Sequence, residues 1–172
     1  EVQTGIGRTG TLFAFQQYGI MPDVVTFAKG IAGGLPMGGI LTGEKCAGVL
    51  SAGTHAATFG GNLISSAAAL EVMRQLTPEL LGAVTKKGAS IRDAVQSWNC
   101  PAVKEVRGLG LMIGISVEGA KPGDLVNKCI DKGLLMLTAG TDALRMLPPL
   151  TITYEEIDRG LAILKTVLEE VN

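Results

Sequence analysis

The sequence predicts an α/β chain made of two parts. A β-branched apolar run at 24–28 (VVTFA), bounded by turn signals, is typical of a buried parallel strand. A long amphipathic helix pattern begins after Thr77, and four further strand candidates follow residue 100. The segment Asn99-Cys100-Pro101 interrupts the helix pattern. We therefore expect one domain over residues 1–99 and a second, smaller α+β domain over 100–172.

Short elements joined by a glycine-rich loop at 30–39 are expected in the first part. In chain order they are a helical stretch at 12–18, the strand at 24–28, a strand within 38–43 (GGILTG), and helices at 44–51 and 62–76. Thr77 and Pro78 then form a helix start, because a capping hydroxyl precedes a proline at the first helical position. Its buried face is expected to hold Leu81, Val84, Gly88, Ile91, Val95 and Trp98.

The second part reads as a compact α+β unit. Strands are expected at 102–107, 110–117, 134–138 and 143–147, with a helix at about 123–132. Thr153 and Glu156 have the spacing of a capping box, which predicts the start of a final helix. Its buried face is expected to hold Ile157, Leu161, Leu164, Leu168 and Val171.

Composition excludes several classes of function. The net charge is −1, so no basic excess is present to bind a nucleic acid backbone. No apolar run approaches the ~20 residues of a membrane span. The single histidine and the spacing of the three cysteines do not suggest a metal site. Free thiols fit a reducing compartment, and we expect a cytoplasmic protein with no metal, nucleic acid or membrane partner.

Lys29 is the first candidate for chemistry. It directly follows the strand at 24–28 and precedes glycine-rich backbone. A lysine in a partly desolvated site loses affinity for its proton, and the neutral amine can form a Schiff base with an aldehyde. The alternative from these local features alone is a surface lysine at the end of a strand.

Five segments of the chain carry a family resemblance in the same order. They are EVQTGIGRTG (1–10), TFAKGIAGGLPMGG (26–39), GTHAATFGGN (53–62), RGLGLMIGISV (107–117) and LRMLPPLTIT (144–153). Together they resemble the class III (ornithine-type) aminotransferases, which use pyridoxal 5′-phosphate (PLP). The resemblance implies the latter part of a fold type I large domain, followed by a small α+β C-terminal domain.

The resemblance also implies roles for individual residues. Lys29 is implied as the residue that holds PLP and moves the proton at the substrate's α-carbon. Val2 is implied to pack against the pyridine ring, and Gln3 to reach the ring's phenolic oxygen. Thr58 is implied to bind the cofactor phosphate across a dimer interface; an ordinary loop hydroxyl is the alternative. Arg145 is implied to bind the amino acid's α-carboxylate, and its alternative is pairing with a protein carboxylate.

The implied reaction is the transfer of an ω-amine between an amino acid and a 2-oxo acid by a homodimer. The segment at 133–140 and LRMLPPLTIT resemble the acetylornithine branch, which transfers the amine of N-acetylornithine to 2-oxoglutarate in arginine biosynthesis. Ornithine, succinylornithine and 4-aminobutyrate are alternative substrates. The chain begins inside the first motif, so we expect a fragment that is inactive alone, or a non-catalytic interaction module. A nucleotide-binding α/β domain is a further alternative, but no strand–GxGxxG–helix unit supports it.

Overall fold

The computed structural model describes residues 1–171 and confirms the mixed α/β class. The chain forms two compact units, Glu1–Leu81 (unit 1) and the residues from Gly82 onward (unit 2). The limit between them falls within helix α2 (Pro78–Ser97), which starts at the expected proline. The domain limits of 1–99 and 100–172 stay a prediction.

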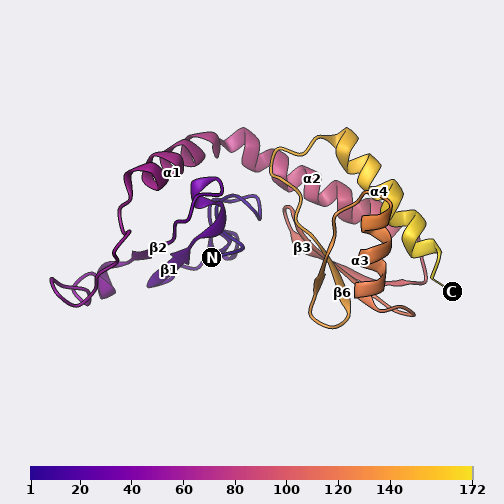
Figure 1. Cartoon of the computed structure of the whole chain (residues 1–172), viewed down its shortest axis with the longest axis horizontal. Helices are drawn as coiled ribbons and strands as arrows, with labels where there is room; N and C mark the ends of the chain where they lie inside the picture. The colour runs from indigo at the N-terminus through magenta and orange to yellow at the C-terminus, as the bar shows by residue number, and fades with distance from the viewer. Residues whose placement is uncertain (172) are drawn as a thin grey trace. The chain divides into compact units, whose positions relative to one another are not determined.

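Unit 1 consists of short elements connected by glycine-rich loops (Figure 1). In chain order they are η1 (Ala14–Tyr18), β1 (Val24–Phe27), η2 (Lys29–Ala32), β2 (Gly39–Thr42), η3 (Glu44–Cys46) and α1 (Leu63–Gln75). Helix α1 begins where expected, because the Asn62 side chain accepts hydrogen bonds from the backbone N–H groups of Ile64 and Ser65, both at 3.1 Å.

Three expectations for unit 1 are corrected by the structure. Strand β1 is not a buried parallel strand: it pairs antiparallel with β2, and Val25 is its only buried residue while Val24 is exposed. The helices expected at 12–18 and 44–51 are the 3-10 turns η1 and η3. The first ends at Gly19 in the left-handed conformation, and the second starts without a side-chain cap. Segments this short do not recover the cost of nucleating an α-helix.

The core of unit 1 is small, and many of its large apolar side chains are exposed. The buried apolar cluster comprises Ile6, Phe13, Val25, Ile31, Ala32 and Ala69. Met21, Phe59 and Leu63 are each at least 84% exposed, and Tyr18, Val49 and Ile64 are also exposed. Unit 1 therefore presents much of its apolar surface to solvent. Apolar surface of this extent is typical of protein interaction sites.

Unit 2 is built on an antiparallel sheet with the strand order β3-β4-β6-β5. The strands are β3 (Val103–Leu109), β4 (Met112–Val117), β5 (Leu137–Ala139) and β6 (Ala143–Met146). The helices are the greater part of α2, together with α3 (Pro122–Asp131) and α4 (Tyr154–Glu169), and α3 packs against α4 and the strands β5 and β6. All four strands and both helices expected beyond residue 100 are confirmed, with ends that differ by a few residues.

The core of unit 2 uses the helix faces predicted from the sequence. On α2, Val84, Gly88, Ile91 and Val95 are buried. Four of the five residues predicted for the last helix are buried, Val167 joins them, and Val171 is half-buried. Gly88 has a special place: a Cβ added to it would lie 1.9 Å from the carbonyl oxygen of Gly110, in the β3–β4 turn. The helix and the turn therefore touch through backbone atoms at this point.

The predicted capping box of the last helix is present, and it leads to a stability prediction. The Thr153 hydroxyl accepts a 3.2 Å hydrogen bond from the Glu156 N–H, and the Glu156 carboxylate accepts one of 2.8 Å from the Thr153 N–H. We expect Thr153→Ala to lower the free energy of unfolding by about 1 kcal/mol, the usual value of such a cap. Urea unfolding at pH 7 followed by circular dichroism measures the change.

The same cap gives the stability a pH dependence. Hydrogen bonds from the Thr153 backbone and hydroxyl hold the pKa of Glu156 below its usual range. A depressed carboxylate pKa stabilises the fold above the unfolded-state pKa of about 4.3, and the stabilisation is lost as the pH falls through the folded-state value. The Thr153→Ala variant should therefore lose less stability than the parent between pH 7 and pH 3. Equal losses in the two proteins would contradict this account of the cap.

Candidate functional site

Lys29 lies at the first position of η2, directly after β1 and the extended residue Ala28. Its φ of 53° places it in the left-handed region, which costs a residue with a side chain about 1–2 kcal/mol. The neighbours Ile31 and Ala32 are buried and fix the turn, so the conformation is imposed on the lysine by the packing that follows it. Backbone strain of this kind is concentrated at functional sites.

The side chain of Lys29 is exposed in unit 1. The partial desolvation expected for Lys29 is therefore not supplied by unit 1 alone. The residues around the lysine are mainly glycine and small apolar residues, which leave its amine accessible to a ligand. The structure thus presents Lys29 as an accessible amine on a rigid turn.

The N-terminal segment packs beside this turn. A Cβ added to Gly30 would lie 3.8 Å from Cγ2 of Ile6, so the loop that carries Val2 and Gln3 contacts the residue next to Lys29. Ile6 is buried, and its own φ of 56° is left-handed. Val2 is 42% exposed and Gln3 is half-buried, both in the turns that precede Ile6.

Glu1 ties this loop together through its carboxylate. The side chain accepts a hydrogen bond from the Thr4 hydroxyl, and a second one of 2.9 Å from the N–H of Phe15. Burial by itself raises the pKa of Glu1, but the hydrogen bonds from Thr4 and from the backbone of Ala14 and Phe15 bring the pKa below its usual value. The ionised carboxylate therefore fixes the path of residues 1–15.

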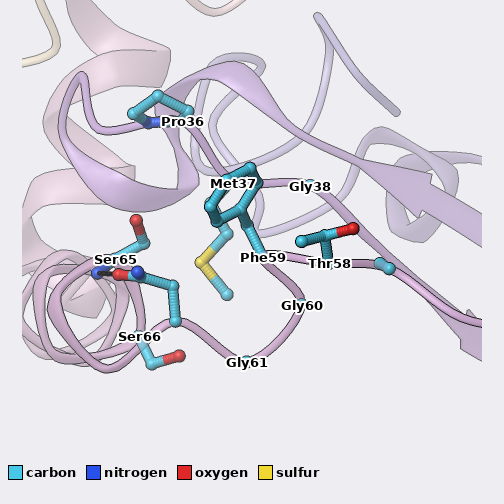
Figure 2. Close-up of a pocket in the computed structure, with 11 residues that line it drawn as sticks. Pro36, Met37, Gly38, Thr58, Phe59, Gly60, Gly61, Ser65 and Ser66 are labelled. Atoms are coloured by element: carbon cyan, nitrogen blue, oxygen red, sulfur yellow. Dashed lines mark hydrogen bonds between the residues drawn. The ribbon is translucent and has the colours of Figure 1, made fainter.

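Thr58 lines a pocket of about 450 Å³ at the start of α1 (Figure 2). In this view its side chain lies on the other side of Met37 and Phe59 from Ser65 and Ser66. The lining consists of Pro36, Met37, Gly38, Ala57, Thr58, Phe59, Gly60, Gly61, Asn62, Ser65 and Ser66. Hydroxyl groups, a glycine-rich backbone and a helix N-terminus favour a phosphate, and no carboxylate is among the lining residues. Lys29 is not among them.

Arg145 lies on β6 in unit 2 and lines a different pocket, of about 690 Å³. Most of that lining is apolar, and Glu156 and Arg159 are its other charged residues. The Nε atom of Arg145 is buried and has no hydrogen-bond partner. A buried guanidinium nitrogen without a partner is costly, and a carboxylate ligand would satisfy it. No protein carboxylate pairs with Arg145 among the described residues, so the alternative of a purely structural ion pair has no support.

Several features near these residues could not be identified from the sequence. The left-handed backbone conformation of Ile6 and Lys29 has no signal in the sequence, because neither residue is a glycine. Folding brings Thr58 together with Met37, Ser65 and Ser66 in one pocket. The one local clue in the sequence is that the two serines follow the helix-capping residue Asn62. Within residues 1–171, no group of three or more His, Cys, Asp or Glu side chains could hold a metal ion, and no helix has the length and apolar character to cross a bilayer.

Comparison with known proteins identifies the family. The sequence profile of the family described as Aminotransferase class-III matches residues 1–168. Acetylornithine aminotransferase of Haemophilus ducreyi is 51% identical over 99% of the chain, and that of Caldanaerobacter subterraneus is 45% identical over 99%. The chain spans less than half of the length of these relatives, 43% and 44% respectively.

Solved structures show the same relationship. Ornithine δ-aminotransferase of Plasmodium falciparum has a TM-score of 0.91 at 33% identity, over 98% of this chain and 46% of its own. N-acetylornithine aminotransferase of Stenotrophomonas maltophilia has a TM-score of 0.86 at 38% identity, over 97% of this chain and 45% of its own. The resemblance inferred from the five sequence segments is therefore confirmed, and the chain belongs to the class III aminotransferases, a family of PLP-dependent enzymes.

Proposed function

We propose that a complete enzyme containing this chain transfers the terminal amine of N-acetylornithine to 2-oxoglutarate, as a step of arginine biosynthesis in the cytoplasm. The relatives named acetylornithine aminotransferase, 42–51% identical over almost the whole chain, favour this substrate. The observation that carries the proposal is Lys29: an accessible amine in a left-handed turn, at the position that the family resemblance gives to the cofactor lysine.

The donor groups of this chain fit the cofactor that the family uses. Lys29 would hold PLP covalently through Nζ, with Val2 against its ring and Gln3 at its phenolic oxygen. When bound, PLP withdraws electrons from the carbon that bears the transferred amine. Lys29 would take up and return the proton at that carbon, and the Thr58 hydroxyl would bind the phosphate. We propose that Thr58 does so for the cofactor of a partner subunit, in a homodimer; its pocket fits an anion and does not include Lys29.

Arg145 would bind the α-carboxylate of 2-oxoglutarate and of the amino acid formed from it, because that carboxylate is next to the carbon that receives the amine. Its unpartnered Nε and its planar fork suit a carboxylate, which accepts two parallel hydrogen bonds. Since the chain spans less than half of its relatives, we propose that the remaining pocket residues belong to the other half of the enzyme. The chain by itself is then expected to be inactive.

Substrate choice gives the first test in a complete enzyme that contains this chain. With 2-oxoglutarate as acceptor, kcat/KM for N-acetylornithine should exceed kcat/KM for ornithine, succinylornithine and 4-aminobutyrate. The closest competing proposal is ornithine, because structures of ornithine aminotransferases match the chain with TM-scores of 0.90–0.91. A higher kcat/KM for ornithine would replace the substrate in the proposal and leave the reaction class intact.

The role of Arg145 gives a second test. Arg145→Lys keeps the positive charge but loses the bidentate geometry, so kcat/KM for 2-oxoglutarate should fall about tenfold or more. Arg74→Lys is the matched control, because Arg74 is 76% exposed and pairs with Glu71 on its own helix. Steady-state kinetics with varied 2-oxoglutarate separate the two. An Arg145→Lys enzyme that behaves like the Arg74→Lys enzyme would contradict the carboxylate role.

A further inference from the structure

One face of the sheet in unit 2 carries two arginines and one carboxylate over a floor of small residues. Strand register places Arg107 opposite Gly114, and Gly114 opposite Arg145. The neighbouring row on the same face contains Glu105, Ser116 and Ala143. Side chains of directly opposed residues point to the same face of a sheet, so Arg107 and Arg145 share it, about 10 Å apart across two strand spacings.

The glycine between the two arginines lets the Arg107 side chain lie across β4. A Cβ added to Gly114 would lie 3.6 Å from Cγ and 3.7 Å from Nε of Arg107. Nη1 of Arg107 donates a hydrogen bond of 2.7 Å to the Glu105 carboxylate and one of 2.6 Å to the buried Ser116 hydroxyl. The Ser116 bond anchors the arginine and so fixes where the Glu105 carboxylate is bound.

Charge balance on this face explains why Arg145 is left without a partner. Glu105 is the only carboxylate among the residues of the four strands, as the structure describes them. Arg107 binds it, and the Nε of Arg145 remains buried without a partner. A free Glu105 would be attracted to the nearest unpaired guanidinium, and on this face that group belongs to Arg145.

We propose that Arg107 is a positioning residue for Arg145. Anchored by Ser116, Arg107 holds Glu105 and prevents it from occupying the guanidinium that receives the substrate carboxylate. Arg107 itself does not touch the substrate in this account. The inference rests on the proposed role of Arg145 and extends it. It explains how an arginine that binds the substrate carboxylate stays unpaired on a sheet that also carries the Glu105 carboxylate.

The test follows the Arg145 Nε–Hε signal by NMR in a complete, ¹⁵N-labelled enzyme that contains this chain, with the signal assigned through its loss in Arg145→Gln. Without ligand, Arg107→Gln should move this signal because the freed Glu105 pairs with Arg145. The double variant Arg107→Gln/Glu105→Gln should return it to the parent position. Arg107→Lys, which retains a cation for Glu105, and Glu105→Gln alone should leave it unmoved. Backbone amide spectra check that each variant is folded.

Titration with 2-oxoglutarate supplies the functional measurement. Its dissociation constant should rise about tenfold in Arg107→Gln and return to the parent value in the double variant, since one charge-assisted hydrogen bond is lost and regained. An unmoved signal in Arg107→Gln, or an equal shift in the single and double variants, would overturn the proposal. If the parent does not respond to 2-oxoglutarate, the carboxylate role of Arg145 fails, while the ligand-free comparison still decides the role of Arg107.

Discussion

Replacing Lys29 with alanine in a complete enzyme that contains this chain is expected to lower kcat by at least about 10²–10⁴-fold. The variant loses both the attachment point of the cofactor and the group that moves the proton, and general acid–base catalysis alone contributes a factor of this size. Steady-state transamination rates at saturating PLP measure the loss. Lys45→Ala is the control, because Lys45 is 78% exposed and pairs with Asp23 at the surface.

Stability separates a functional lysine from a structural one. Since Lys29 has a φ of 53°, Lys29→Gly should relieve backbone strain and raise the free energy of unfolding by about 1 kcal/mol. Lys29→Ala keeps the strain and should leave the stability nearly unchanged. A gain in stability together with a loss of activity would show that the strained residue Lys29 serves activity and not stability. A Lys29→Gly enzyme that is active, or that unfolds more easily than the parent, would contradict this view.

The largest effect on stability is expected for Gly88→Ala in α2. Alanine normally stabilises a helix by about 1 kcal/mol relative to glycine. At Gly88, however, the new Cβ would lie 1.9 Å from the oxygen and 2.4 Å from the carbon of the Gly110 carbonyl. Both are backbone atoms and cannot rotate away, so the helix and the β3–β4 turn must separate. We expect a net loss of about 2 kcal/mol or more in the free energy of unfolding.

Gly82 in the same helix provides the matched control for this prediction. A Cβ added there has no neighbour within 4 Å, so Gly82→Ala should gain about 0.5–1 kcal/mol from helix propensity alone. Urea unfolding followed by circular dichroism gives both values. The two substitutions are chemically identical, and opposite signs would show that the approach of Gly110 decides the outcome. A Gly88→Ala protein as stable as the Gly82→Ala protein would refute the close approach.

The parts of the fold that the sequence predicts well are those with a local cause. Thr153 and Glu156 specify a cap whose two hydrogen bonds form within four residues, and the apolar spacing from Val84 to Val95 specifies a helix face. The direction of β1 has no local cause. An apolar run such as VVTFA does not indicate its partner, and pairing with β2 makes it antiparallel and largely exposed.

The candidate site divides in the same way. Lys29, Thr58 and Arg145 could be proposed because their segments resemble a family, and the accessible lysine and the unpartnered Nε support two of those proposals. The left-handed turn at Lys29 follows from the burial of Ile31 and Ala32, which local sequence does not reveal. The cluster of Arg107, Glu105 and Ser116 depends on the register of β3 against β4, and register is a property of the folded sheet.

Covalent labelling of Lys29 tests the central claim most directly. A complete enzyme that contains this chain would be incubated with PLP, treated with borohydride to make the linkage permanent, and analysed by intact mass and peptide mapping. The account predicts one phosphopyridoxyl group per chain, located on Lys29, absent in Lys29→Ala and retained in Lys45→Ala. A protein that carries no such group, or carries it on other lysines while Lys29 stays unmodified, would show that Lys29 does not hold the cofactor.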